Sequence, residues 1–364
     1  MSNKTYIVSS KTKEEAKIVI RIFLSKASDF DLESKIFKCL GGQGIGPKEI
    51  EVTPVYRVEE CIDGRALTYL ELRDSEIGTR LMQMICQMNY DENLKELVSD
   101  RTSIQSRDFI EDRQKGWFWR YKEEVQKTLE GSSQLRLRPR GRIIQEYFTK
   151  LMQHEDELIS DYRELFSIYD PAKRPHDVVF SHNDFQENNV LINNTEQLKL
   201  TLIDFEYSGP NYRGYDIASF MNEQFMDYII KEAPFFKIMP EEYCEYLRDS
   251  VKASSIFEEH IESYLRTYAS LINTPNPEEF IKNERAIFKD QVYRCILMSH
   301  IQWVFWCFIM MPHERLNTEE GANKCLEFHM EYAYQRMQLY FKVRNIILPS
   351  LAHRLPDPNE EGSD

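Results

Sequence analysis

The chain has 364 residues, of which 42% are hydrophobic and 29% charged, and its formal net charge is -14. This length suits two lobes that share a cleft, and the apolar content can build a sizeable core. The negative charge argues against broad binding to nucleic acid or to an anionic membrane surface, and it suits a small cationic ligand.

Cysteine usage and hydropathy indicate a cytoplasmic protein. The seven cysteines are scattered, with no Cys-x-x-Cys pair and no zinc spacing, which predicts reduced thiols. The start, MSNKTYIVSS, lacks the basic stretch and apolar core of a secretory signal. The strongest apolar run, Trp303 to Met311, stops at Pro312 and is less than half of the roughly 20 residues that span a bilayer. No transmembrane segment is therefore predicted.

The first sixty residues predict a small α+β unit. Apolar alternation and helical spacing predict, in chain order, strands at 5–8 and 17–23, a helix at 31–40 and a strand at 52–60. The first two strands read as an antiparallel hairpin. The glycines of GGQGIG, at 41–46, follow a helix and precede Pro47, which favours a helix C-cap with a turn over a phosphate-binding loop.

The rest of the chain, from Leu72 onward, is predicted to be mostly helical. A basic, flexible loop at 129–142 and a strand pair at 190–203 interrupt it, and the acidic tail at 356–364 is expected to be disordered. Long helices are expected at 217–231, 241–272, 279–311 and 318–345.

The segment FSHNDFQENNVLI, at 180–192, crowds polar residues between two apolar runs. Asp184 and Asn189 have the five-residue spacing of the Asp and Asn in the kinase catalytic loop, H-R-D-x-x-x-x-N. Asp204 ends a strand at IDFE, where the kinase D-F-G aspartate would sit. Phosphoryl transfer needs a carboxylate near the attacking hydroxyl and oxygen ligands for Mg²⁺. Singly each residue could cap a turn, but together and in this order they favour a kinase.

Two weaker patterns leave alternatives open. Arg21 on its strand and Glu33 on the next helix could form the ion pair that holds nucleotide phosphates, or they could be solvated surface charges. Trp303 and Trp306 share one helix face because they lie three residues apart. That spacing fits a buried aromatic stripe, or a cage for a quaternary ammonium, a cation best held by π faces.

Three segments resemble the choline/ethanolamine kinase family, and choline kinase most of all: HNDFQENNVL, LIDFEYSGPNYRGYDIASFMNEQFMDY and SHIQWVFW. The resemblance covers nearly the whole chain, with SNKTYIV similar to the end of the family's nucleotide loop, KIVIRIF to its Arg-bearing strand and YRVEECIDGRAL to its hinge. It implies a two-lobed, protein-kinase-like α+β fold. The small N-terminal lobe, 1–62, would carry an antiparallel sheet and a helix, and the large C-terminal lobe, 63–355, would be mainly helical.

The resemblance also implies an activity, the phosphorylation of choline to phosphocholine by ATP with Mg²⁺, which opens phosphatidylcholine synthesis by the CDP-choline route. Asp184 would be the catalytic base, with Asn189, Asp204 and Gln186 at the metal. ATP would meet Arg21, Glu33, Glu59, Glu60 and Ile62. The amino alcohol would contact Asp184, Glu223, Tyr228, Trp303, Trp306 and Tyr332. Assembly into a homodimer is left open.

Departures from the family pattern keep two alternatives open. The glycines expected just before SNKTYIV are absent, which admits a choline-binding pseudokinase, and Asn188 stands where the family often has Gly. Ethanolamine as the preferred substrate is the other alternative.

The spacing of Glu223 and Tyr228 sets a condition on the helix that carries them. Their side chains project about 140° apart on an ideal helix. Both can therefore reach one ligand only if the helix bends or ends between them.

Overall fold

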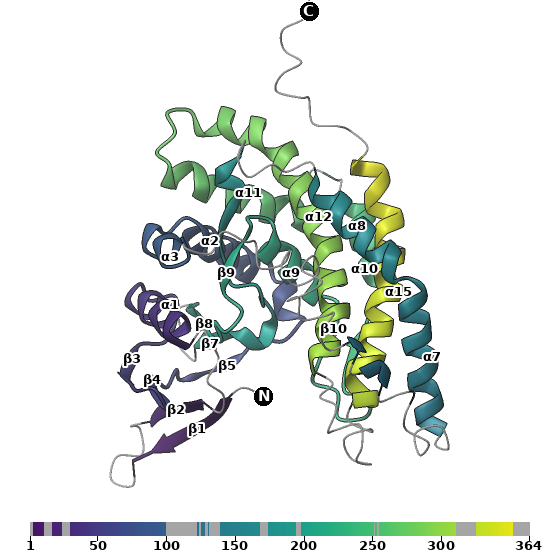
Figure 1. Cartoon of the computed structure of the whole chain (residues 1–364). Coiled ribbons are helices and arrows are strands. Elements are labelled where there is room, and N and C mark those ends of the chain that lie inside the picture. The colour runs from purple at the N-terminus through teal and green to yellow at the C-terminus, as the bar shows by residue number, and fades with distance from the viewer. Residues whose placement is uncertain are drawn as a thin grey trace, which may run out of the picture.

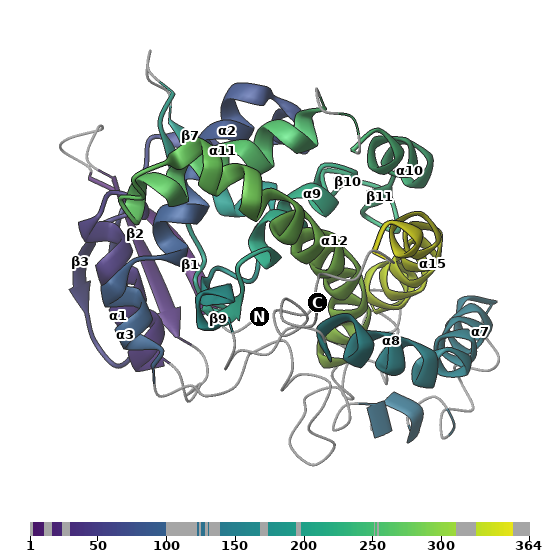
Figure 2. The ribbon, with the colours of Figure 1, turned by 90° about the horizontal axis from the view of Figure 1, so that it is seen from above.

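The computed structural model has two lobes, with a small sheet at the N-terminal side and a larger body of helices (Figures 1 and 2). The small lobe holds the purple strands at the lower left of Figure 1, and α7 and α15 lie at the far side of the molecule. The structure describes residues 3–10, 17–23, 30–99, 122–123, 125–127, 130, 139–167, 174–193, 198–250, 252, 255–310 and 325–351.

The small lobe is a four-stranded antiparallel sheet in the order β1-β2-β4-β3, with one helix, α1. The predicted hairpin is confirmed, since β1 and β2 pair along their whole length. The other edge of β2 pairs with β4, where Arg21 of β2 lies opposite Arg57. The elements are β1 (Asn3–Ser9), β2 (Lys17–Phe23), α1 (Phe30–Gly42), β3 (Glu49–Val52) and β4 (Tyr56–Glu60).

The single strand predicted at 52–60 is wrong, because the chain reverses there and forms β3 and β4. Pro54 lies in the turn and has no backbone N–H for a strand ladder. The Thr53 backbone N–H donates to the Tyr56 carbonyl at 2.8 Å, and the Thr53 hydroxyl accepts from the Tyr56 N–H at 3.1 Å. Two strands joined by a tight turn therefore replace the one continuous strand.

The glycine segment after α1 ends the helix, as predicted. Gly44 has a φ of 74°, which glycine adopts without strain, and the N–H groups of Ile45 and Gly46 both donate to the Leu40 carbonyl at 3.1 Å. A side chain at Gly46 would lie 3.2 Å from the ring of Phe205. The turn therefore packs α1 closely against the segment that carries Asp204.

Two small sheets hold the polar loop and the strand end at Asp204. The predicted strand pair at 190–203 is confirmed as an antiparallel hairpin with Val190 opposite Leu202. The polar loop lies between β6 and β7, which belong to different sheets, in the orders β6-β9 and β5-β7-β8. These strands are β5 (Gly64–Ala66), β6 (Val178–Ser181), β7 (Val190–Asn193), β8 (Leu200–Leu202) and β9 (Gly209–Tyr212).

The large lobe is mainly helical, as predicted, and α12 packs along α15, α11 and α9 (Figure 2). Its core is apolar and aromatic, and it includes Leu81, Phe220, Tyr264 and Ile301, each 0% exposed. The helices are α2 (Ser75–Asn89), α3 (Glu92–Leu97), α7 (Pro139–Gln153), α8 (Glu155–Ser167), α9 (Tyr215–Glu223), α10 (Pro240–Asp249), α11 (Ile256–Leu271), α12 (Pro277–Met310) and α15 (Glu331–Leu351). No helix of the described residues combines the length and the apolar character needed to cross a membrane.

Several predicted helix bounds need correction. The helix predicted at 217–231 ends at Glu223, after which the chain enters a two-residue strand, β10 (Met226–Asp227). The helix predicted at 241–272 is two helices, because Ser255 caps the start of α11 by accepting the Glu258 backbone N–H. The helix predicted at 279–311 is confirmed as α12.

Other predicted segments fall partly or wholly outside the described residues. The predicted loop at 129–142 is wrong at its end, because α7 begins at Pro139, a residue suited to the first turn of a helix. Residues 131–138 lie outside the described residues, and so do the predicted tail at 356–364 and the predicted helix start at 318–324. A π-helix, Cys325–Met330, leads into α15.

Candidate functional site

The polar loop between β6 and β7 is anchored by Asp216 in the first turn of α9. The Asp216 carboxylate accepts the backbone N–H of His182 at 2.8 Å and that of Asn183 at 2.9 Å. Asn183 has a φ of 68°, a left-handed conformation that Asn tolerates better than most residues. Sequence reasoning did not select Asp216, although it lies within the NYRGYDI segment that carried part of the resemblance.

The loop is also joined to the chain just before Asp204. The Asn189 carbonyl accepts the Ile203 N–H at 3.0 Å, and a ring nitrogen of His182 lies 3.0 Å from the Ile203 carbonyl. The side-chain amide of Asn189 donates to the Asp184 carboxylate at 2.8 Å. The structure therefore brings together Asp184, Asn189 and Asp204, as their order and spacing predicted.

Asp204 connects the two lobes through Arg21. The Arg21 Nη1 lies 3.3 Å from the Asp204 Oδ1, although 183 positions separate the two residues in the sequence. Asp204 has a φ of 68°, and its side chain is 34% exposed, so the carboxylate can still meet a ligand. The small-lobe sheet and the polar loop thus share one charged contact.

The predicted ion pair between Arg21 and Glu33 does not form within the described residues, and this prediction needs correction. Glu33 pairs with Arg57 at 3.1 Å, while Glu59 accepts from Arg57 at 2.9 Å and lies 3.3 Å from the Arg21 Nε. Strand register is the reason, because it sets Arg57 beside Arg21, and the Arg57 guanidinium covers the ring of Phe37 on α1 at 3.8 Å. Glu33 therefore acts on Arg21 only through its negative charge at longer range, without contacting it.

The predicted hinge residues have side chains engaged inside the small lobe. The Glu59 carboxylate is held by Arg57 and Arg21, and the Glu60 carboxylate accepts the Lys48 backbone N–H at 3.1 Å. The Glu60 backbone N–H is engaged as well, because it donates to the Lys48 carbonyl at 2.9 Å, so the rest of the backbone toward Ile62 is what this segment can offer a nucleotide base.

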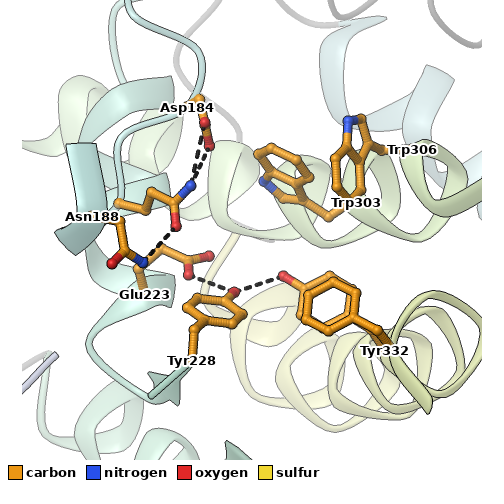
Figure 3. A pocket seen from close by; sticks show the side chains of 9 residues that line it. Asp184, Asn188, Glu223, Tyr228, Trp303, Trp306 and Tyr332 are labelled. Carbon is orange, nitrogen blue, oxygen red and sulfur yellow. Dashed lines mark hydrogen bonds between the residues drawn. The ribbon is translucent and has the colours of Figure 1, made fainter. Parts of the chain in front are cut away.

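A cavity of about 250 Å³ opens beside Asp184. Figure 3 shows the carboxylate on one side of it, the two indoles on another, and the two phenols with Glu223 below. The walls come from the polar loop, the end of α9, the residue after β10, α12, the π-helix before α15, and the start of α15. The lining residues are Asp184, Gln186, Asn188, Glu223, Tyr228, Trp303, Trp306, Phe328 and Tyr332.

Both predicted tryptophans line this cavity. Their rings meet edge to face, with centroids 5.1 Å apart and planes 74° apart. The Trp306 indole N–H donates to the Tyr207 hydroxyl at 3.1 Å, so its polar group is satisfied away from any ligand. The buried-stripe alternative is thus incomplete, since both side chains pack on the core and also wall a pocket.

Glu223 and Tyr228 both reach the cavity because α9 ends at Glu223, which meets the condition stated from the sequence. The Tyr228 hydroxyl donates to the Glu223 Oε2 at 2.8 Å and lies 2.9 Å from the Tyr332 hydroxyl (Figure 3). Two predicted residues of one segment and a third 104 positions farther along the chain therefore form one hydrogen-bonded group.

Sequence reasoning missed Phe328 as a lining residue. Its ring stacks on Tyr332, with centroids 5.6 Å apart and planes 6° apart. The signal was present, because residues four apart lie on the same face of a helix and Tyr332 was already selected. Asn188, noted in the sequence only as a departure from the family pattern, also lines the cavity, and its amide donates to the Glu187 carboxylate at 3.1 Å.

Burial sets the protonation of the carboxyl groups around the loop. It raises the pKa of Asp184 to about 7, with a further contribution from the negative charge of Asp204. Burial likewise raises the pKa of Glu187 to about 8 and that of Asp216 to about 6. A carboxyl group whose pKa lies near neutrality can accept and release a proton at working pH.

These shifts predict that, in a chelating buffer, the free energy of unfolding falls as pH rises from 6.5 to about 8. The pKa of Asp184 is higher in the folded protein than the unfolded value of 3.8, so its stabilising contribution is full below that value and lost as pH passes about 7. Buried histidines such as His260, whose pKa falls from 6.5 to about 4, are neutral in the folded protein in this range, and their opposing contribution shrinks as the unfolded imidazoles lose their protons above pH 6.5. Urea unfolding at several pH values measures the slope, which Asp184→Asn should reduce. A slope identical in the variant would contradict the assignment.

The polar side chains at the loop fit a hard divalent cation. Because the Asn189 amide nitrogen is used on Asp184, its oxygen stays available as a ligand, and Asp204 adds a part-exposed carboxylate. Such oxygen donors suit Mg²⁺. Gln186 lies beside them, with its amide nitrogen 3.3 Å from the Asp184 carboxylate.

Comparison with known proteins agrees with this geometry. The profile of the choline/ethanolamine kinase family matches residues 1–341. The chain is 29% identical to mouse choline kinase alpha over 85% of its own length and 60% of that protein's, and 26% identical to rat choline/ethanolamine kinase over 92% and 74%. The crystal structure of choline kinase from Cryptosporidium parvum Iowa II is 25% identical and superposes with a TM-score of 0.63, covering 97% of this chain and 90% of that one.

The family match runs from the small lobe through the polar loop and the tryptophan helix into α15, so it includes every segment that lines the cavity. The superposed choline kinase shows that the two-lobed, protein-kinase-like fold is shared over nearly the full length. This chain is a member of the choline/ethanolamine kinase family.

Proposed function

We propose that this chain transfers the terminal phosphoryl group of ATP to the hydroxyl of choline, giving phosphocholine and ADP. The observation that carries the proposal is that one cavity joins a carboxyl group with a pKa of about 7 to a wall of indole and phenol rings. The rings suit a cation without N–H groups, and the carboxyl group suits a hydroxyl.

In this reaction Asp184 orients the choline hydroxyl and accepts its proton as the new O–P bond forms. The bond between the terminal phosphorus and the bridging oxygen breaks, and ADP leaves with that oxygen. Because the transition state is loose, the protein contributes mainly position and charge neutralisation. Asn189 donates its side-chain amide N–H to Asp184 from the same loop, and its amide oxygen is the atom that would meet the metal.

Asn189, Asp204 and Gln186 would hold the Mg²⁺. When bound, this ion neutralises charge on the phosphates and so reduces their repulsion toward the attacking oxygen. The support is the donor set itself, which offers amide and carboxylate oxygens rather than nitrogen or sulfur ligands.

We further propose that residues 1–62 bind the nucleotide and residues 63–355 carry catalysis and the amino alcohol. Arg21 would meet the phosphates, since it extends from the small-lobe sheet to Asp204. Glu33 and Glu59 would hold Arg21 and Arg57 in place, and the backbone from Glu60 to Ile62 would meet the adenine. The scattered cysteines support a cytoplasmic location.

Ethanolamine is the second candidate acceptor, and Glu223 is the observation that favours it. A primary ammonium can donate to a carboxylate, and Glu223 lines the same cavity as the rings.

The test is ADP release from Mg²⁺ and ATP with choline, ethanolamine and an aminoglycoside as acceptors. We expect choline to give the highest kcat/KM, with the aminoglycoside inactive. Choline binding without ADP release from any acceptor would support the pseudokinase alternative and overturn the proposal.

Replacing either Trp303 or Trp306 by Leu should raise the KM for choline about fivefold and leave kcat nearly unchanged. One ring face contributes about 1 kcal/mol to binding a cation, and the reacting groups lie elsewhere in the cavity. Steady-state kinetics at saturating ATP measure both constants. Phe308→Leu is the matched control, because this buried ring lies on the same helix outside the cavity lining. An equal loss of kcat in the Trp variants would contradict a role confined to cation binding.

A further inference from the structure

Arg336 lies behind the cavity wall and is paired with Glu223. Its side chain is 0% exposed, its Nη1 lies 3.2 Å from the Glu223 Oε1, and its guanidinium lies 5.6 Å from the centroid of the Tyr332 ring. It follows Tyr332 by four residues on α15, so both side chains leave the same helix face. Sequence reasoning did not select Arg336.

The buried position of Arg336 is costly. A buried guanidinium needs a partner for its charge and for its N–H groups, and within the described residues its Nε and Nη2 have no hydrogen-bond partner. Burial alone would lower the pKa of Arg336, but Tyr332, Glu223 and Tyr228 together raise it. Arg336 therefore stays charged beside a single carboxylate, that of Glu223, and this ion pair fixes the orientation of Glu223.

Glu223 has both carboxylate oxygens engaged. Arg336 donates to Oε1 at 3.2 Å, and the Tyr228 hydroxyl donates to Oε2 at 2.8 Å. Since the Tyr228 proton is used on Glu223, the Tyr332 hydroxyl donates to the Tyr228 oxygen across 2.9 Å. Both Glu223 oxygens and the Tyr228 hydroxyl are thus engaged with Arg336 and with one another, and the rings of Tyr228 and Tyr332 line the cavity beside them (Figure 3).

This arrangement distinguishes two kinds of ammonium. A primary ammonium has three N–H donors that need acceptors, whereas a trimethylammonium has none. Leaving N–H groups without acceptors in a pocket is costly, and a cavity wall whose carboxylate oxygens already accept other donors therefore selects against them. The negative charge of Glu223 remains close to either cation.

We propose that Arg336 is a positioning residue that makes the cavity prefer a quaternary over a primary ammonium, because it occupies the Glu223 oxygen that a primary ammonium would use. The inference rests on the proposed function and specifies how that site chooses its substrate. Arg336 acts on the substrate through Glu223 and does not line the cavity.

The test measures kcat/KM for choline and ethanolamine in the unmodified protein and in Arg336→Met. Removing the cation frees Oε1, so we expect the choline-to-ethanolamine ratio to fall about tenfold or more, the worth of one hydrogen bond to a charged group. In the Glu223→Gln background, adding Arg336→Met should leave the ratio unchanged, since the carboxylate is already absent. Met337→Ala, a buried change on the same helix, controls for destabilisation and should keep the wild-type ratio.

Each outcome separates the two claims. An unchanged ratio in Arg336→Met, or the same fall in the Glu223→Gln background, overturns the inference while ADP release still supports the proposed function. A preference for ethanolamine in the unmodified protein also overturns it. If Arg336→Met does not fold, Tyr228→Phe frees Oε2 with the buried cation in place. An unchanged choline-to-ethanolamine ratio of kcat/KM in that variant also overturns the inference. Absence of ADP release with both alcohols rejects the proposed function instead.

Discussion

Asp184→Asn is expected to lower kcat with choline by about a hundredfold to ten-thousandfold, the usual contribution of a positioned proton acceptor. Asn has nearly the same shape and keeps an oxygen for the Asn189 amide, but it cannot take the hydroxyl proton. The KM for choline should change little, since the rings that would hold the ammonium are untouched. ADP release under saturating ATP and choline measures kcat directly.

The variant should also remain folded, and above pH 7 it should be at least as stable as the unmodified protein. Burial disfavours the charged form of Asp184, so a neutral amide removes a cost that grows with pH. Asp249→Asn is the matched control, because this surface carboxylate pairs with Lys252 and its side chain is 53% exposed. Turnover near normal in Asp184→Asn would exclude this residue as the base.

The polar loop was predictable because short-range spacing controls it. Five residues separate Asp184 from Asn189, and the strands on both sides fix where that interval begins and ends. Asp204 follows from the same logic, since the hairpin of β7 and β8 returns the chain beside Asn189. Local patterns of this kind are visible in one sequence.

The charged network of the small lobe was not predictable in the same way. Whether Arg21 meets Glu33 depends on which residue of β4 lies beside it, and strand register places Arg57 there. Nothing in the spacing of Arg21 and Glu33 contains that information. The break at Pro54 did have a local signal, which the apolar alternation on both sides obscured.

The contacts in the cavity wall were also hard to predict from the sequence, because they join residues that are far apart in the chain. The family resemblance implied that Tyr228, Trp303 and Tyr332 would contact one ligand, and they line one cavity. The pairing of Arg336 with Glu223 joins α15 to α9 across 113 positions, and it requires the packed arrangement of both helices with α12. A buried Arg in a helix is not marked as such in the sequence, since most Arg residues are exposed.

Asp204→Asn is expected to reduce kcat by more than a hundredfold at ordinary Mg²⁺ concentrations and to raise the Mg²⁺ concentration for half-maximal activity at least tenfold. The substitution keeps an oxygen but removes the negative charge that a hard cation prefers. Even partners that only support a metal ligand change metal affinity about ten- to a hundredfold. The φ of 68° at this position is tolerated by Asn as well as Asp, so the backbone should not resist the change.

Titrating Mg²⁺ separates the two roles that the contact with Arg21 gives this carboxylate. If Asp204 holds the metal, raising Mg²⁺ should restore part of the lost activity, because mass action offsets the weaker site. If it only holds Arg21, added Mg²⁺ cannot restore the lost ion pair, and the deficit should persist. Glu59→Gln provides the comparison, since it removes the other carboxylate beside Arg21, at 3.3 Å, without changing a proposed metal ligand. A shifted Mg²⁺ requirement in Asp204→Asn but not in Glu59→Gln therefore assigns the metal to the strand end, while equal shifts in both would assign the effect to Arg21.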